Sequence, residues 1–225
     1  MKLRFVALLL FFMTVANGNE STKTVASCAW LEEEINPVSP RKHTPFYTYN
    51  ERLEELVNHQ INYEMNAFYS YLNMASYFGT VENNLEGFYN YFHSSAMEEL
   101  KHAEMLMKYQ AKRGGRNKLL PIQKPIQSNI WTNSVDVMKD ALKLEKDITT
   151  KLLCLHRLAN DKYNDVDLVN FLEGEMIPEQ YSSMSQIQSH IHNIQKLASS
   201  GNKSLTNYGL AEFHYNIELL KRKEK

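Results

Sequence analysis

The stretch Glu98-Glu99-Leu100-Lys101-His102-Ala103-Glu104 places two polar side chains, Glu99 and His102, on an otherwise apolar helical stripe. The rest of this stripe steps by threes and fours, which return to one face of an α-helix: Phe88, Phe92, Ser95, Leu106 and Tyr109. Burying a carboxylate is costly unless it is paired or holds a metal. The stretch therefore predicts a long helix that carries part of a site into a core.

Three further amphipathic segments each carry one polar group on their apolar stripe: Glu64, Glu145 and Gln180. Glu64 and Glu99 are 35 positions apart, and so are Glu145 and Gln180. The two helix pairs therefore place their polar groups at matching heights. A lone Glu-x-x-His is common on helices, so the prediction of a shared site rests on the joint placement.

The periodicity predicts an all-α fold, a four-helix bundle with one long crossover and a short fifth C-terminal helix. The expected helices cover residues 50–78, 85–112, 134–158, 167–197 and 208–221. Pro178 should kink the fourth helix, because proline lacks the amide that a helix interior needs. Residues 116–132 contain Pro121 and Pro125 and should form the crossover.

The N-terminus is typical of secretion. Residues 1–18 combine Lys2 and Arg4 with a short apolar run and small residues at a cleavage position, which predicts a signal peptide. The alternative, a retained membrane anchor, is disfavoured because the run is too short to span a bilayer. We expect an extended arm over 19–47, a main domain over 48–225, and a secreted or secretory-lumen protein without a membrane span after signal removal.

Charge and cysteine content narrow the function classes. Without residues 1–18 the chain has 23 basic and 26 acidic residues, which argues against a nucleic-acid partner. Cys28 and Cys154 do not form a disulfide framework. They could pair within or between subunits, or remain free. Sequons at Asn19 and Asn202 are compatible with a secreted chain.

Carboxylates with one imidazole suit iron better than a thiolate set would. Di-iron bundles use a Glu from each of two helices and Glu-x-x-His from each of the other two. Glu99 can bridge two ions, Glu64 and His102 would hold the first, and Glu145 would hold the second. Gln180-x-x-Ser183 replaces the second Glu-x-x-His, which predicts one tighter and one looser position. Tyr71 shares the face of Glu64, although a packed core tyrosine is the simpler interpretation.

Several motifs resemble those of ferritin: Gln60-Ile61-Asn62-Tyr63-Glu64, residues 98–104, Arg113-Gly114-Gly115-Arg116, Leu144-Glu145-Lys146 and Glu179-Gln180. The likeness covers about 47–220 and points to a secreted, invertebrate-type, heavy-chain-like subunit. It implies a shell of 24 subunits, homo- or hetero-oligomeric, that oxidises Fe(II) with O₂ and stores the ferric mineral. The implied ferroxidase residues are Glu64, Tyr71, Glu99, His102, Glu145 and Gln180.

The sequence departs from this family pattern at two places. Glu98 and Glu104 match the mineral-nucleation glutamates, but Lys101 replaces the acid between them. The iron channel of the family would be lined here by Asn170 and Glu173, with His156 nearby, and Asn170 replaces an acid. We therefore expect a weaker pull on Fe(II). The competing hypotheses are a storage subunit with little oxidase activity and a monomeric helical signalling protein.

Overall fold

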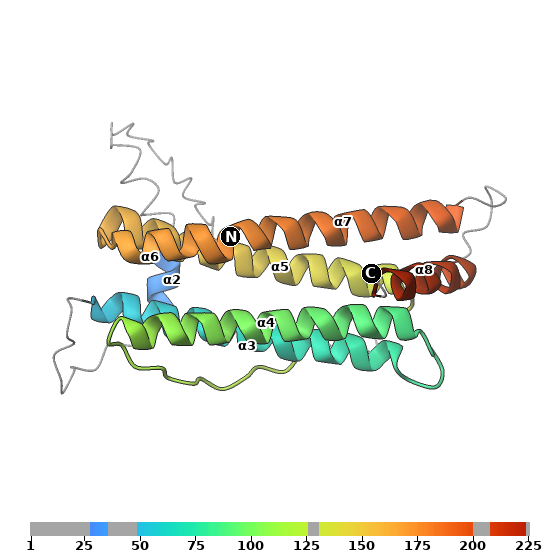
Figure 1. Cartoon of the computed structure of the whole chain (residues 1–225), viewed down its shortest axis with the longest axis horizontal. Helices are drawn as coiled ribbons and strands as arrows, with labels where there is room; N and C mark the ends of the chain where they lie inside the picture. Colours follow the sequence, from blue (N-terminus) through green and yellow to red (C-terminus); the bar gives the residue numbers. More distant parts are fainter. Residues whose placement is uncertain (1–27, 36–48, 126–130, 200–207, 224–225) are drawn as a thin grey trace, which may run out of the picture.

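The computed structural model describes residues 28–35, 49–125, 131–199 and 208–223. Four long helices lie side by side in a bundle: α3 (Glu51–Phe78), α4 (Glu86–Lys112), α5 (Ser134–Arg157) and α7 (Ile177–Ser199). The α3/α4 pair lies against the α5/α7 pair, and the α4–α5 connection runs back along the bundle (Figure 1). The predicted all-α bundle with one long crossover is confirmed.

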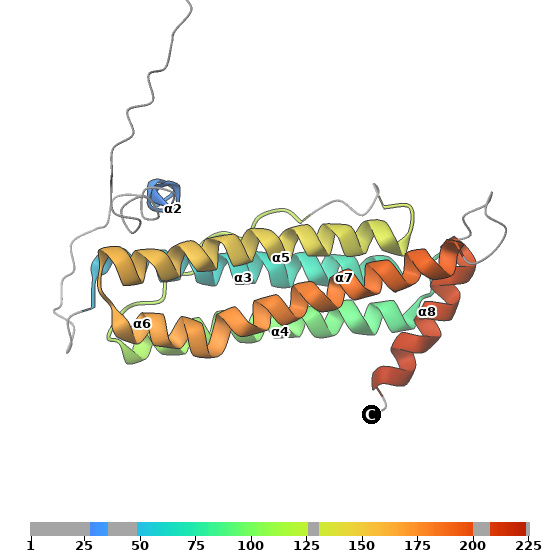
Figure 2. The same ribbon diagram turned by 90° about the horizontal axis from the view of Figure 1, so that it is seen from above.

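The predicted short fifth helix, α8 (Tyr208–Lys223), closes one end of the bundle. It lies at a steep angle to the four long helices (Figure 2) and packs against α4 and α7. Its start agrees with the predicted position, because the 3.6-residue periodicity resumes there after the break in the apolar pattern. No helix within the described ranges is long and apolar enough to cross a membrane.

The helices at the opposite end depart from regular α geometry. The π-helical turn η2 (Leu158–Lys162) extends α5, and the π-helical turn η3 (Leu172–Met176) joins α6 (Val166–Phe171) to α7. In η3 the amide of Ile177 reaches back to the carbonyl of Leu172. The helix is therefore irregular directly before Pro178, where the missing proline amide predicts a disturbance.

The prediction of an extended arm over 19–47 is wrong for the part that the structure describes. Residues Ala29–Glu33 form the short helix α2, which is held by a disulfide between Cys28 and Cys154. Leu31 and Ile35 are buried beside it. Apolar burial and the covalent link thus order a segment that is too short for a stable helix alone. The predicted signal peptide and both sequons lie outside the described residues.

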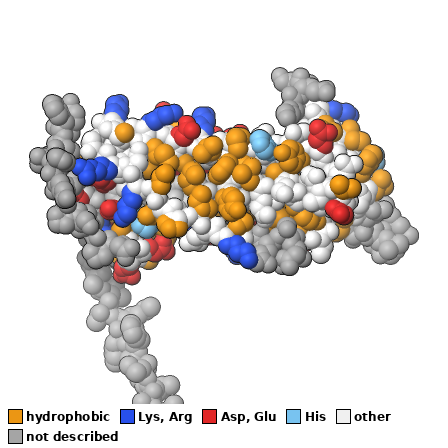
Figure 3. Space-filling view, turned by 90° about the horizontal axis from the view of Figure 1, so that it is seen from below, with side chains coloured by type: hydrophobic (Ala, Val, Ile, Leu, Met, Phe, Trp, Pro, Cys, Tyr) orange, Lys and Arg blue, Asp and Glu red, His pale blue; other side chains and the backbone are white. Residues whose placement is uncertain are grey.

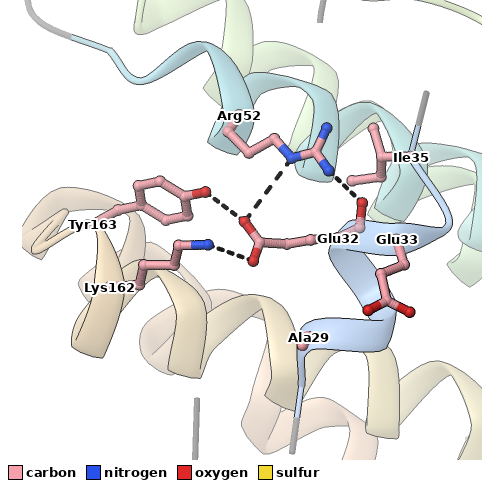
Figure 4. A pocket seen from close by; sticks show the side chains of 7 residues that line it. All are labelled: Ala29, Glu32, Glu33, Ile35, Arg52, Lys162 and Tyr163. Atoms are coloured by element: carbon pink, nitrogen blue, oxygen red, sulfur yellow. Dashed lines mark hydrogen bonds and ion pairs between the residues drawn. The ribbon is translucent and has the colours of Figure 1, made fainter. Parts of the chain in front are cut away.

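Polar contacts complete the docking of α2 (Figure 4). The carboxylate of Glu32 accepts hydrogen bonds from Lys162 Nζ at 2.6 Å and from the Tyr163 hydroxyl. The Arg52 guanidinium donates to the Glu32 carbonyl. Glu34 accepts a hydrogen bond from the Tyr63 hydroxyl at 2.6 Å. The segment therefore connects α3, α5 and η2.

The apolar core consists of two separate clusters, one toward each end of the bundle. Leu53, Leu106 and Leu152 belong to the cluster near α6. Phe78 and Phe92 belong to the cluster near α8. On every long helix the polar stripe position falls between the residues of the two clusters. The sequence therefore interrupts the core at one height, and this layer holds the candidate site.

Candidate metal centre

Three side chains in the polar layer form a group that could hold a metal ion. One ligand atom from each of Glu64, Glu99 and His102 lies within 4.8 Å of the others. All three residues are buried, with at most 3% of their surface exposed. Helix α3 supplies Glu64 and α4 supplies the other two, as the stripe predicts. The structure therefore brings the predicted first position together.

Glu145 and Gln180 complete the layer from α5 and α7, and each is 1% exposed. The Tyr71 hydroxyl donates a hydrogen bond to Glu145, so Tyr71 lies in the polar layer and contacts a candidate ligand. The Ser183 hydroxyl lies near enough to Glu145 to lower the pKa of that carboxyl. The second half of the layer thus consists of one carboxylate, one amide and neutral hydroxyl groups.

Sequence reasoning missed two residues that orient these ligands. Gln60 Nε2 donates to Glu64 Oε1 at 2.8 Å, from one turn earlier on α3. The Thr149 hydroxyl lies within hydrogen-bond distance of two oxygens, Gln180 Oε1 at 2.9 Å and the Glu145 carbonyl oxygen at 2.7 Å. Spacing could have indicated both, because each lies four positions from a ligand on its own helix. Their hydrogen bonds restrict the rotamers of Glu64 and Gln180.

The electrostatics of the layer favour a bound cation. Burial raises the pKa of Glu64 well above its usual value, and the charge of Glu99 raises it further. Burial and the charge of Glu145 likewise raise the pKa of Glu99. The pKa of Glu145 is raised by burial, although hydrogen bonds from Tyr71 and Ser183 oppose the shift. A divalent ion would remove this repulsion among carboxylates.

Three buried polar atoms of the layer make no hydrogen bond: Glu64 Oε2, His102 Nε2 and Glu145 Oε2. His102 Nε2 lies 3.0 Å from Glu179 Oε2, but this contact does not have the geometry of a hydrogen bond. Unsatisfied buried polar atoms are costly and call for an explanation. These atoms are two carboxylate oxygens and one imidazole nitrogen of the same buried layer, and such atom types fit the ligand preferences of iron.

The other predicted residues lie outside this buried group. Glu98 and Glu104 are on α4, and Glu104 pairs with Lys108 at 3.3 Å. His156 Nε2 contacts Glu173 Oε1 at 2.7 Å, beside the exposed Asn170. The structure therefore brings His156 and Glu173 together, but near the α6 end of the bundle.

Comparison with known proteins agrees with this arrangement. A family model described as a ferritin-like domain matches residues 54–197. The chain is 38% identical to the "Soma ferritin" of Lymnaea stagnalis over 172 residues, which are 76% of this chain and 92% of that protein. It is 39% identical to a "Ferritin, middle subunit" of Salmo salar over 155 residues, 69% of this chain and 87% of that protein. The matched span includes all five polar stripe residues, Glu64, Glu99, His102, Glu145 and Gln180.

Proposed function

The chain belongs to the ferritin family, and from this premise we propose that its buried polar layer oxidises Fe(II) with O₂ while the assembled shell stores the ferric product. Membership assigns the chain to iron-storage proteins of the invertebrate type. The single observation that carries the catalytic proposal is the set of three unsatisfied buried atoms on Glu64, His102 and Glu145.

In this proposal iron is the substrate. Glu64 and His102 bind the first Fe(II), Glu99 bridges, and Glu145 with Gln180 binds the second. Each Fe(II) gives one electron to O₂. Because burial raises the pKa values of Glu64 and Glu99, these carboxyls release protons when the metal binds. Tyr71 orients Glu145 through its hydrogen bond.

The two halves of the layer should differ in affinity. The first position has two carboxylates and an imidazole within 4.8 Å of one another. The second shares Glu99, and its amide ligand, Gln180, already accepts a hydrogen bond from Thr149. Fewer charged ligands mean weaker binding of a hard cation. The looser second position would allow oxidised iron to leave for the mineral.

Assembly into a shell of 24 subunits, from this chain alone or with another ferritin chain, is part of the proposal. Hydrophobic side chains gather on the face over α3, α4 and the crossover (Figure 3). Tyr69, Leu119 and Ile122 are among the exposed apolar residues of α3 and the crossover. Apolar surface of this kind is typical of contacts between subunits.

Iron would reach the layer past His156, Asn170 and Glu173, and the mineral would nucleate near Glu98 and Glu104. Glu173 is the acid of the proposed channel, and its contact with His156 on α5 supports this assignment. Lys101 between Glu98 and Glu104 should weaken nucleation. We also propose that residues 1–18 are removed and that the protein is secreted. Residues 19–47 then form an N-terminal extension, and residues 48–225 form the main domain.

Glu99→Ala tests the catalytic proposal, because Glu99 would contact both ions. We expect the initial rate of Fe(II) oxidation in air to fall on the order of tenfold or more, with assembly intact by particle mass. Glu82→Ala, in the exposed α3–α4 turn, is the control for handling and assembly. A parental rate in Glu99→Ala would reject the di-iron assignment and favour a storage subunit with little oxidase activity.

A further inference from the structure

Three side chains of the bundle surround the carboxylate of Glu32. Lys162 Nζ donates a hydrogen bond to Glu32 Oε2 at 2.6 Å, and the Tyr163 hydroxyl donates one to Glu32 Oε1. Arg52 Nε lies 3.9 Å from the same Oε1. The two oxygens thus have different partners, two of which carry a positive charge (Figure 4). Such an arrangement recognises a carboxylate by its charge and by its shape.

The partners belong to the bundle, whereas the carboxylate belongs to the short helix α2. Arg52 lies in the first turn of α3, Lys162 ends η2, and Tyr163 follows it. Helix α2 lies against these elements at the α6 end of the bundle (Figure 1). The bundle therefore positions the three residues, and α2 supplies the group that they bind.

The surroundings of Glu32 favour an anion. Burial raises its pKa, but hydrogen bonds from Lys162 and Tyr163 and the charges of Lys162 and Arg52 outweigh this effect and lower the pKa below its usual value. Only 13% of the Glu32 side chain is exposed. Loss of this carboxylate would leave two partly buried cations without its charge, so another anion would be attracted to the same position.

A pocket of about 520 Å³ leads from the solvent to this position. The bundle contributes Arg52, Lys162 and Tyr163 to its lining, and residues 29–35 contribute the rest. If the Glu32 carboxylate were absent, a small anion would enter through the pocket and contact the same three side chains.

The disulfide between Cys28 and Cys154 fixes α2 beside these side chains. Cys28 is fully buried and Cys154 is 4% exposed, so a thiol reaches the bond only when α2 opens locally. Helix α2 has five residues, which is too short for a helix that is stable alone. The disulfide therefore decides whether Glu32 stays in its position.

We propose that Arg52, Lys162 and Tyr163 form a carboxylate-binding site, which Glu32 closes while the disulfide is intact. An organic dithiol opens the site. It gives two electrons and two protons to the disulfide and becomes a cyclic disulfide itself, while the two cysteines become thiols. Helix α2 then leaves, and a small free carboxylate replaces Glu32. The site lies outside the buried polar layer and does not depend on the ferroxidase proposal.

The first test removes the Glu32 carboxylate and keeps the disulfide. In Glu32→Ala, α2 should open more often, so dithiothreitol should reduce the disulfide several-fold faster than in the parent protein. Sodium acetate should restore slow reduction because acetate fills the vacated position, whereas sodium chloride at the same ionic strength should not. Glu33→Ala, on the same helix and exposed, is the matched control and should be reduced at the parental rate in either salt.

The second test measures binding to the opened site by the broadening of the acetate proton resonance. We expect broadening with Cys28→Ser, and equally with the parent protein after reduction by dithiothreitol. The oxidised parent and the double variant Cys28→Ser/Lys162→Gln should broaden the resonance several-fold less. Cys28→Ser/Lys108→Gln removes an exposed lysine of α4 and should resemble Cys28→Ser.

Two results would overturn the proposal. If acetate and chloride had the same effect on the reduction of Glu32→Ala, the three side chains would not form a carboxylate site. If the oxidised parent and Cys28→Ser broadened the acetate resonance equally, the disulfide would not close the site. Both results are independent of Fe(II) oxidation, which Glu99→Ala tests separately.

Discussion

The side-chain oxygen of Asn216 on α8 accepts a hydrogen bond from the amide of Gly87, the second residue of α4, at 2.6 Å. The amide of Phe88 lies 3.4 Å from the same oxygen. The N-cap residue of α4 is Leu85, which has no side chain able to accept these bonds. Helix α8 therefore caps α4 from a position 129 residues away in sequence.

Asn216→Ala should destabilise the protein by about 1 kcal/mol, because it leaves two amides at the start of α4 without their acceptor. Chemical unfolding of the protein measures the change, with Glu82→Ala as the exposed control. Gly87→Ala should destabilise the protein more than Asn216→Ala, since the added Cβ would lie 2.2 Å from the Asn216 carbonyl oxygen. Unchanged stability in both variants would show that α8 does not support α4.

The Cys28–Cys154 disulfide closes a loop of 126 residues. Cys28→Ser should lower the free energy of unfolding by about 2–4 kcal/mol, because the unfolded chain loses a constraint. It should also release α2, which limited proteolysis after residue 35 would detect. Glu32→Gln is the comparison, since it weakens the contacts to Lys162 and Tyr163 but keeps the covalent link. Equal protease resistance in Cys28→Ser and the parent protein would contradict the docking of α2.

The bundle could be predicted from the sequence because every long helix repeats its apolar residues at helical spacing. The partner of Cys28 could not, since Cys28 lies in an aperiodic segment and a single pair of cysteines leaves both intramolecular and intermolecular pairing open. The polar layer could also be predicted, because each long helix carries a polar residue on its apolar stripe. The bond from Thr149 to Gln180 could not, because it depends on how α5 and α7 are rotated about their axes.

Titration of buried carboxyls should give the metal-free protein a distinctive pH profile. Burial and the charge of Glu99 raise the pKa of Glu64 above its model-compound value of 4.5, so the folded state binds this proton more tightly than the unfolded chain. The stabilising contribution is full below that value and is lost as pH rises through the folded-state pKa. Glu64→Gln should remove this loss and stabilise the metal-free protein near neutral pH.

Asp165 is the matched control of opposite sign. Burial alone would raise its pKa, but hydrogen bonds from Arg113, one of them 2.8 Å long, lower it below 3.8. Its contribution is present above that value and is lost as pH falls through the folded-state pKa. Asp165→Asn should therefore reduce stability near neutral pH. Chemical unfolding in the presence of a chelator across the pH range checks both variants. If Glu64→Gln showed the same pH dependence of stability as the parent protein, the assignment of a raised pKa to Glu64 would be refuted.

Iron uptake should respond to charge at the proposed channel. Asn170 is exposed and lies three residues before Glu173, whose carboxylate contacts His156 at 2.7 Å. Asn170→Asp should speed uptake at low ionic strength, and added salt should reduce the gain because it screens the field. Gln188→Glu adds the same charge at an exposed site on α7 and should not speed iron uptake. A salt-independent gain, or the same gain in both variants, would argue against the channel.

The two halves of the polar layer should fill at different concentrations of a divalent probe such as Zn²⁺. Glu64, Glu99 and His102 already lie within 4.8 Å of one another, whereas the second half relies on Glu145, a share of Glu99 and the neutral Gln180. Ser183 lowers the pKa of Glu145, so a histidine at this position would lie beside the second half of the layer, where it could coordinate the second ion.

Ser183→His should therefore tighten the second position and slow the release of oxidised iron, because imidazole is a stronger ligand than a hydroxyl group. Ser182→His, one residue away and exposed, is the control that adds an imidazole outside the layer. Anomalous scattering during a Zn²⁺ titration would report both occupancies directly. The parent should fill the Glu64 position first, and Ser183→His should narrow the difference. Equal occupancy of both positions in the parent at every concentration would refute this asymmetry, while the rate in Glu99→Ala would still decide the ferroxidase function.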